Sequence, residues 1–365
     1  MRINFDVRNA LNEGGIGAYK KHLSLELSKQ EGVEIVGCCN FQRNVKLRMH
    51  QTFNFPITIS IIPDRLAYGN YDLPISYELM MNRTADLNYF GTYFLPRVKF
   101  RKPLISTIHD IIVLKTNLES PAFIESHRSQ LLHTVKLSQY VFTISQKSKE
   151  DIVDMFNIDP DKVHIVHNGV DIKWPKNVNS NQERLTQKYN LPERYILYLG
   201  QYRKHKNVER LLQAYSLLPI IVRKELKLVV TCKIPELVKL AYDLKIYEDI
   251  VFTGYIDTED KPFLYKMADM VYYASLYEGF GVPIIEAQAC GSPVITSNTS
   301  SMPEASGGFA ELVDPNSTDD IYQAILELHN NSFRRNYLIE NGYKNANLYT
   351  WQKSGKELYE FLQNI

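Results

Sequence analysis

Short apolar runs alternate along this sequence with stretches whose apolar residues recur at helical spacing. The runs cover residues 3–7, 33–39, 104–108, 141–144 and 163–166, and amphipathic stretches at 19–29 and 148–155 lie between neighbouring runs. A strand that is buried on both faces is apolar throughout, and successive parallel strands need a crossover helix between them. The alternation therefore predicts an α/β fold in which helices cover a parallel sheet.

The same alternation begins a second time after residue 183. Strands are expected at residues 195–199, 226–231, 250–252, 270–274 and 293–296, with helices at 208–217 and 283–290. We interpret the polar stretch at 173–183 as a linker, and 365 residues exceed what one hydrophobic core usually fills. We therefore expect two doubly wound lobes, with a ligand in the cleft between them at the carboxyl ends of their strands.

Composition argues against several classes of function. The 42 basic and 41 acidic residues leave a net charge of +1, which gives no support to nucleic-acid binding. The four cysteines, at positions 38, 39, 232 and 290, lack metal-binding spacing and fit a reducing compartment. The chain has no run of about 18 apolar residues and no signal-peptide pattern at its start, so we expect a cytoplasmic protein.

One part of the N-terminal half is basic. Residues 43–102 hold nine Lys or Arg and four Asp or Glu, which gives a net charge of +5. A solvated face is the simpler interpretation of this surplus. The alternative is a surface for a phosphorylated acceptor or for peripheral contact with anionic lipid at the inner face of a membrane.

A segment near residue 280 combines features of a phosphate-binding loop. The string EGFGVPIIE covers residues 278–286, between the expected strand at 270–274 and the expected helix at 283–290. Its two glycines let the backbone approach a ligand, and Pro283 suits the first turn of a helix that starts near Val282. The N-terminus of that helix presents N–H groups and a partial positive charge to a phosphate. The glutamates alone are weak evidence, because Glu286 could simply complement the helix dipole.

The longer string EGFGVPIIEAQACGSPVI resembles the donor-binding signature of retaining family 4 glycosyltransferases, which have the GT-B fold. The resemblance covers nearly the whole chain, with similar motifs at residues 14–17 (GGIG), 107–110 (TIHD), 144–148 (ISQKS), 168–171 (NGVD), 205–207 (HKN) and 252–255 (FTGY). The strings PLISTIHDIIVL at 103–114 and SSMPE at 300–304 look most similar to bacterial mannosyltransferases of O-antigen and capsule assembly.

This resemblance implies a GT-B architecture, in which two Rossmann-like doubly wound lobes face a central cleft. Residues 1–172 would form the acceptor-side lobe and residues 173–348 the lobe that binds the nucleotide sugar. Residues 349–365 would form a helix that crosses back onto the N-terminal lobe.

The resemblance also implies roles on the donor side. Glu286 would bond the ribose hydroxyls and Glu278 would face the donor sugar, because an ionised carboxylate accepts several strong hydrogen bonds. Sugar hydroxyls and phosphate would be held by the backbone of Gly279, Phe280, Gly281 and Val282. Arg203 and Tyr255 are assigned to the donor as well, although the family usually has its arginine at the position of Gln201. The expected nucleotide pocket also departs from the family pattern at Cys232, near which relatives usually carry a glycine.

Four further residues are assigned by the same comparison. The glycine loop of Gly14 and Gly15 would close over the diphosphate or the acceptor, and an ordinary glycine turn is the alternative. Lys206 would stabilise the charge of the departing diphosphate, and His109 would lie near the reacting carbon at the carboxyl end of a strand. A solvated lysine and a structural histidine are the simpler interpretations. We assign His109, Lys206 and Glu278 as catalytic.

The expected reaction is metal-independent transfer of a hexose with retention of configuration. The favoured donor is GDP-mannose, the acceptor is a hydroxyl of a growing surface polysaccharide or lipid-linked glycan, and no cofactor is expected. The DxD string at 159–161 lies in a predicted turn, so we assign no metal to it. Lys20 stands where a GxGxxG dinucleotide fingerprint would need its last glycine, which argues against an NAD-dependent dehydrogenase. A nucleotide-sugar epimerase of the same architecture and a non-catalytic donor-binding subunit remain alternatives.

Overall fold

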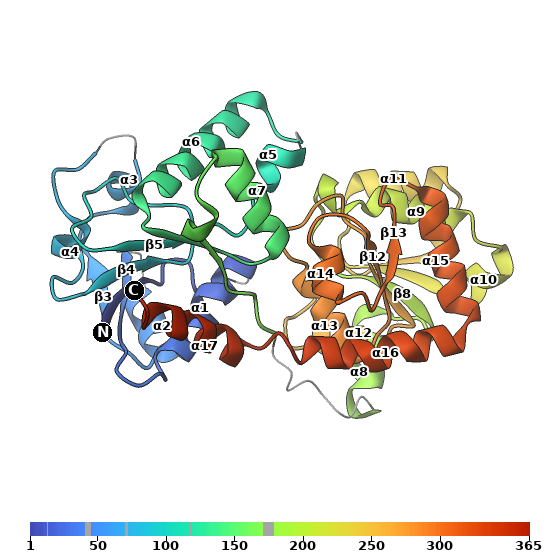
Figure 1. Cartoon of the computed structure of the whole chain (residues 1–365). Coiled ribbons are helices and arrows are strands. Elements are labelled where there is room, and N and C mark those ends of the chain that lie inside the picture. The colour runs from blue at the N-terminus through green and yellow to red at the C-terminus, as the bar shows by residue number, and fades with distance from the viewer. Residues whose placement is uncertain (13, 41–44, 70–71, 117, 171–178) are drawn as a thin grey trace. The chain divides into compact units, whose positions relative to one another are not determined.

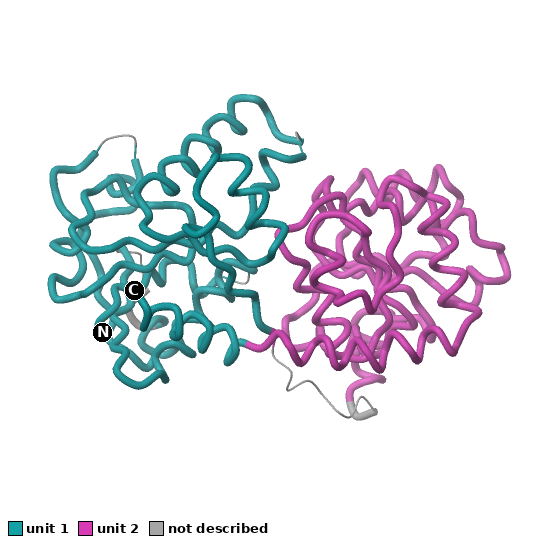
Figure 2. The backbone as a smooth tube through the Cα atoms, viewed as in Figure 1, with its two compact units in different colours: residues 1–169, 351–365 teal, residues 170–350 magenta. Residues whose placement is uncertain are grey.

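The computed structural model describes residues 1–12, 14–40, 45–69, 72–116, 118–170 and 179–365 (Figure 1). The chain divides into two compact units, coloured separately in Figure 2. Unit 1 contains residues 1–169 and 351–365, and unit 2 contains residues 170–350. The corresponding boundaries expected from sequence were 172/173 and 348/349.

Unit 1 is built on a seven-stranded parallel sheet with the order β3-β2-β1-β4-β5-β6-β7. Its strands are β1 (Arg2–Asp6), β2 (Glu34–Asn40), β3 (Ile57–Ser60), β4 (Leu87–Phe90), β5 (Leu104–Thr107), β6 (Tyr140–Thr143) and β7 (Val163–Ile165). Its helices are α1 (Gly15–Leu27), α2 (Val45–Thr52), α3 (Asp64–Ala67), α4 (Tyr77–Met80), α5 (Ile112–Thr116), α6 (Pro121–Leu137), α7 (Gln146–Phe156) and α17 (Trp351–Leu362), with a 3-10 turn η1 (Pro160–Lys162).

Unit 2 contains a six-stranded parallel sheet with the order β10-β9-β8-β11-β12-β13. Its strands are β8 (Tyr195–Tyr198), β9 (Lys227–Val230), β10 (Ile250–Phe252), β11 (Met270–Tyr273), β12 (Val294–Ser297) and β13 (Glu311–Val313). Its helices are α8 (Asn179–Tyr189), α9 (Val208–Ser216), α10 (Ile220–Glu225), α11 (Pro235–Asp243), α12 (Lys261–Met267), α13 (Val282–Cys290), α14 (Met302–Ser306), α15 (Thr318–Asn330) and α16 (Ser332–Ala346), with 3-10 turns η2 (Lys204–Lys206) and η3 (Tyr247–Asp249).

Both sheets reverse their strand order once. In unit 1 the chain runs outward from β1 to β3 and returns to place β4 on the other side of β1; in unit 2, β11 returns beside β8. All described pairings are parallel, which confirms the predicted α/β class with two Rossmann-like units. In such sheets the carboxyl ends of the strands at the reversal are where ligands bind.

The expected linker at 173–183 is wrong for its second half. Residues 173–178 lie outside the described residues, whereas residues 179–183 belong to α8. This helix buries Leu185 and Tyr189, which are four positions apart and therefore share one helical face. The remaining residues of the helix are largely polar, so composition alone suggested a linker there.

The amphipathic helix expected at the chain's end is α17, which packs in unit 1 against α1. A Cβ atom added to Gly355 would lie 2.5 Å from Cβ of Glu26, so the two helices approach closely there. Leu358 and Leu362 are buried, and the ring of Phe361 lies 4.3 Å from that of His164.

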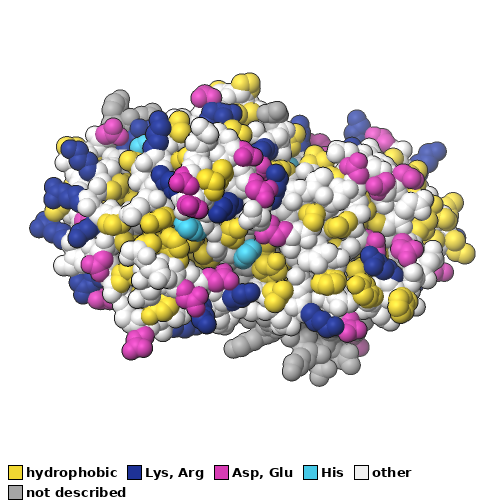
Figure 3. Space-filling model, viewed as in Figure 1, with side chains coloured by type: hydrophobic (Ala, Val, Ile, Leu, Met, Phe, Trp, Pro, Cys, Tyr) yellow, Lys and Arg dark blue, Asp and Glu magenta, His cyan; other side chains and the backbone are white. Residues whose placement is uncertain are grey.

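Of the basic residues within 43–102 whose side chains the structure describes, Arg65, Arg83, Lys99 and Arg101 are among the exposed ones, and Arg97 is half-buried. On the face seen in Figure 3, acidic and basic side chains are interspersed, and Lys and Arg gather at the left edge. Within the described parts of the chain, no helix has the length and apolar character needed to cross a membrane.

Candidate functional site

The loop between β11 and α13 has the geometry expected from sequence. Helix α13 begins at Val282 with Pro283 in its first turn, and it ends at left-handed Gly291, which has a φ of 76°. Gly281 caps the helix start with a φ of 114°. A Cβ atom on Gly281 would lie 2.8 Å from Cδ1 of Ile284. Only glycine fits this position without strain or displacement of a core side chain.

Two serines hold the EGFG loop from the side. The Ser300 hydroxyl accepts a hydrogen bond from Glu278 N at 3.3 Å and donates to Glu278 O at 2.7 Å. The Ser301 hydroxyl donates to Glu278 O at 2.8 Å and to Phe280 O at 2.9 Å. Ser300 adopts a left-handed φ of 56°, which is uncommon outside glycine. The SSMPE motif therefore acts as a clamp that fixes the backbone of the loop.

Lys206 and Glu278 meet directly in unit 2. The Lys206 Nζ lies 2.6 Å from Glu278 Oε1, and their side chains are 19% and 11% exposed. The same ammonium donates to the Tyr273 hydroxyl at 2.6 Å. We call Lys206, Glu278 and Tyr273 the Lys206 cluster. Sequence reasoning named its lysine and its glutamate and missed its tyrosine.

The backbone around Lys206 is tied to the end of β11. Lys206 ends the 3-10 turn η2, and α9 begins two residues later at Val208, the residue at which the helix was expected. The next residue, Asn207, is left-handed and donates from Nδ2 to Ala274 O at 3.1 Å and to Pro315 O at 2.7 Å. Leu276 N donates to His205 O at 2.7 Å. These bonds set where the lysine side chain starts.

Glu286 lies on the second turn of α13 and is half-buried. The Tyr265 hydroxyl donates to its Oε2 at 3.0 Å. Burial raises the pKa of Glu286, while the positive charge of Lys261 and the Tyr265 hydrogen bond lower it. The Glu286 charge also helps to raise the pKa of Tyr273, after burial and Glu278. Glu286 is therefore electrostatically coupled to the Lys206 cluster.

The two remaining donor-side assignments lie on exposed residues. Arg203 is the N-cap of η2, and Tyr255 follows left-handed Gly254 with 68% of its surface exposed. Their assignment depends on the resemblance alone.

In the glycine loop of unit 1, the local fold does not itself require glycine at Gly14 or Gly15. Gly14 has an ordinary extended φ of −110°, and a Cβ atom on either Gly14 or Gly15 would meet nothing within 4 Å. The local fold needs its glycine at Gly17, where a Cβ atom would collide with Asn12 O and lie 2.9 Å from Asn9 O. The open space around Gly14 and Gly15 leaves their backbone accessible to a ligand.

His109 is buried beyond the end of β5. Its Nε2 lies 3.2 Å from Gly91 O, and its ring packs edge-on against Tyr19 at 4.8 Å. Burial, with the nearby Lys20 charge, lowers the pKa of His109 to about 4, although the bond to Gly91 O acts in the opposite direction. The imidazole is thus neutral near pH 7 and donates to a backbone carbonyl, as a structural histidine would.

A buried ion pair near His109 was not predicted from the sequence. Lys20 Nζ lies 2.5 Å from Asp6 Oδ2, and both side chains are only 2% exposed. Lys20 also donates to Arg8 O at 2.9 Å, and the Arg8 guanidinium lies 3.5 Å from the ring centroid of Tyr68. The available signal was the string FDVR, which has two charged residues directly at the end of an apolar strand.

The DxD string forms a local cap. Asp159 Oδ1 accepts from Asp161 N at 2.9 Å, as an Asx turn does. Among the described residues, no three His, Cys, Asp or Glu side chains are grouped to hold a metal ion.

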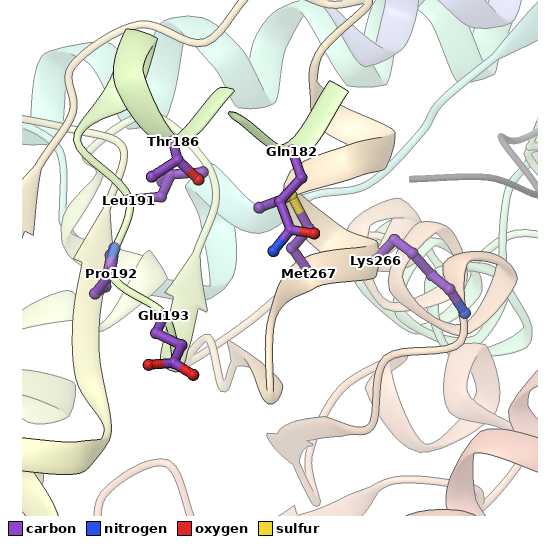
Figure 4. Close-up of a pocket in the computed structure, with 7 residues that line it drawn as sticks. All are labelled: Gln182, Thr186, Leu191, Pro192, Glu193, Lys266 and Met267. Carbon is purple, nitrogen blue, oxygen red and sulfur yellow. The ribbon is translucent and has the colours of Figure 1, made fainter. Parts of the chain in front are cut away.

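A hollow of about 440 Å³ lies elsewhere in unit 2, between the α8–β8 segment and the end of α12 (Figure 4). Its lining residues are Gln182, Thr186, Leu191, Pro192, Glu193, Lys266 and Met267. None of them belongs to the Lys206 cluster or to the other assigned site residues.

Each half of the chain matches a glycosyltransferase family model. Residues 13–174 match the family model described as Glycosyltransferase Family 4, and residues 181–345 match Glycosyl transferases group 1. O-antigen chain mannosyltransferase B of Escherichia coli is 30% identical over 285 residues, which cover 73% of this chain and 71% of that protein. Serotype-specific mannosyltransferase WbdA of Escherichia coli is 30% identical over 229 residues, or 60% of this chain and 28% of WbdA.

Among solved structures, Anabaena HepE in complex with UDP and glucose superposes with a TM-score of 0.73. The match covers 100% of both chains at 17% sequence identity, so it bears on the fold alone. With both family models and a relative at 30% identity, the chain belongs to glycosyltransferase family 4 and has the GT-B fold.

Proposed function

We propose that this chain is a retaining mannosyltransferase that uses GDP-mannose and a hydroxyl of a growing surface polysaccharide or lipid-linked glycan. The sugar is suggested by the relatives named O-antigen chain mannosyltransferase B and WbdA. The observation that carries the catalytic part of the proposal is the Lys206–Glu278 pair, whose glutamate is the first residue of the EGFG loop held by Ser300 and Ser301.

The donor would be held by charge and by hydroxyl recognition. The start of α13, opened by Gly281, offers N–H groups and a partial positive charge to the diphosphate. Glu286 would accept hydrogen bonds from the ribose hydroxyls, and its raised pKa would return toward the ordinary value once these donors reach it. Glu278 would face the mannose hydroxyls in the same way.

The chemical step needs charge stabilisation more than proton transfer by a side chain. As the bond between the anomeric carbon and the phosphate oxygen breaks, the electron pair leaves with the diphosphate, and the Lys206 ammonium would stabilise that charge. The acceptor hydroxyl would attack the carbon on the same face, and its proton would pass to the departing diphosphate oxygen. Configuration is retained because departure and attack share one face.

No metal is needed in this scheme, because Lys206 and the α13 N-terminus supply positive charge at the diphosphate. In unit 1 we assign His109 to the transferred sugar, as a neutral hydrogen-bonding group. We assign Gly14 and Gly15 to a loop whose backbone approaches the diphosphate or the acceptor.

A thermal-shift panel of GDP-, UDP-, ADP- and dTDP-sugars tests the donor. GDP-mannose should raise the melting temperature by a few degrees in the presence of EDTA, because a ligand that binds only the folded state stabilises it by about 2.7 kcal/mol at 100 times its Kd. A selective response to a UDP-sugar would replace the proposed donor, and no response to any donor would contradict the proposal.

Transfer and stereochemistry need a separate measurement. Release of GDP should depend on added glycan acceptor, and proton NMR of the product should show the anomeric configuration of the donor. Conversion of the donor without acceptor would indicate the epimerase alternative.

A further inference from the structure

Tyr273 shares the Lys206 ammonium with Glu278. Its hydroxyl accepts from Lys206 Nζ at 2.6 Å, and its ring centroid lies 4.9 Å from the same nitrogen. Glu278 Oε1 accepts from this nitrogen at 2.6 Å. An ammonium has three N–H donors, so two fixed acceptors define the direction of the third.

Tyr273 is itself rigidly held. It is the last residue of β11, a strand paired with β8 on one side and with β12 on the other. The Thr296 hydroxyl donates to Tyr273 O at 2.8 Å, and the tyrosine side chain is buried. Burial and the charge of Glu278 raise the pKa of Tyr273 well above its usual range. The phenol therefore stays neutral and keeps its place under the ammonium at physiological pH.

We propose that Tyr273 is a positioning residue for glycosyl transfer, which orients the Lys206 ammonium so that its third N–H is directed at the departing diphosphate. This role rests on the proposed function. A hydrogen bond that is already in place when charge develops needs no reorganisation during the reaction, which is how a fixed donor lowers a barrier. Without the phenol oxygen, the ammonium would keep one fixed partner and could rotate about it.

The direct test compares Tyr273→Phe with wild-type enzyme. The variant keeps the aromatic ring and loses the acceptor of one charge-assisted hydrogen bond, so we expect kcat to fall about tenfold. The donor KM should change by less than about twofold, because the rest of the donor site is intact. Tyr195→Phe is the matched control, since its buried hydroxyl donates to Leu264 O at 2.9 Å, away from Lys206. Its kcat should stay within about twofold of wild type.

A double-variant cycle separates positioning from general destabilisation. In the Lys206→Met background, Tyr273→Phe should cause no further loss of kcat, because the group that it orients is gone. Wild-type kcat in Tyr273→Phe, or independent losses that multiply in the double variant, would overturn the role of Tyr273 while leaving the proposed function intact. A wild-type enzyme without turnover on any donor would overturn both.

Discussion

Lys206 and Glu278 are 72 residues apart in the sequence, yet they form an ion pair of 2.6 Å within unit 2. Each was assigned to the site for its own reason, the lysine for the diphosphate and the glutamate for the sugar. Their contact implies that an arriving donor must compete with Glu278 for the lysine or share it. Substitution of either residue should therefore affect the other.

Lys206→Met should lower kcat by roughly 100- to 1,000-fold, because the charge on the leaving diphosphate loses its preorganised cation. Steady-state transfer kinetics at saturating donor measure this effect, and Lys224→Met on an exposed lysine of α10 is the control. A loss confined to KM would show that Lys206 binds the donor without stabilising the transition state.

Glu286→Ala should weaken nucleotide binding about tenfold or more, because charge-assisted hydrogen bonds to the ribose would be lost. Isothermal titration with GDP measures the change. Exposed Glu248, in η3, provides a control of equal charge. Unchanged GDP affinity in Glu286→Ala would remove Glu286 from the donor site.

Gly281→Ala should destabilise the protein by about 2–4 kcal/mol and abolish donor binding. The added methyl group forces a left-handed alanine and also meets Ile284 at 2.8 Å. Gly308→Ala is a control that also has a positive φ, of 76°, but open space around its Cβ position, and it should cost only about 1–2 kcal/mol. Equal melting temperatures for the two variants would contradict the steric argument.

Lys20→Met should cost about 3–5 kcal/mol of folding stability, because it leaves the Asp6 carboxylate buried without its partner. The double variant Asp6→Leu/Lys20→Met should recover most of that loss, since it removes both charges from the interior. Denaturant unfolding of the full chain measures the free energies of unfolding of the single and the double variant. Losses that simply add would mean that the two side chains are not energetically coupled.

Stability should fall with acid through His109. Its pKa is about 4 in the folded protein, below the 6.5 of an unperturbed histidine, so the unfolded chain binds the extra proton between these values. Wild type should therefore lose about 2 kcal/mol more than His109→Gln between pH 7 and pH 5. Unfolding free energies at the two pH values provide the measurement, and parallel curves would contradict burial of a neutral imidazole.

Local sequence determined most elements of both sheets. The apolar runs at β2, β5, β8 and β11 were readable because a strand buried on both faces leaves a continuous signal. Strands β3 and β4 were not expected, because four-residue segments such as LNYF and ITIS mix polar residues into the run. Helix α8 was not predicted because only one of its faces is buried, so most of its residues are polar.

At the candidate site, sequence alone predicted the features that neighbouring residues encode: the helix start near Val282, Pro283 in its first turn and the helix end at residue 290. Only the tertiary structure decided that Tyr273 lies under Lys206, that Ser300 and Ser301 hold the EGFG loop, and that Asp6 pairs with Lys20. These contacts join residues 14 to 67 positions apart. They depend on which strand ends the parallel sheets bring together. Neither turn chemistry nor periodicity along the chain encodes that arrangement.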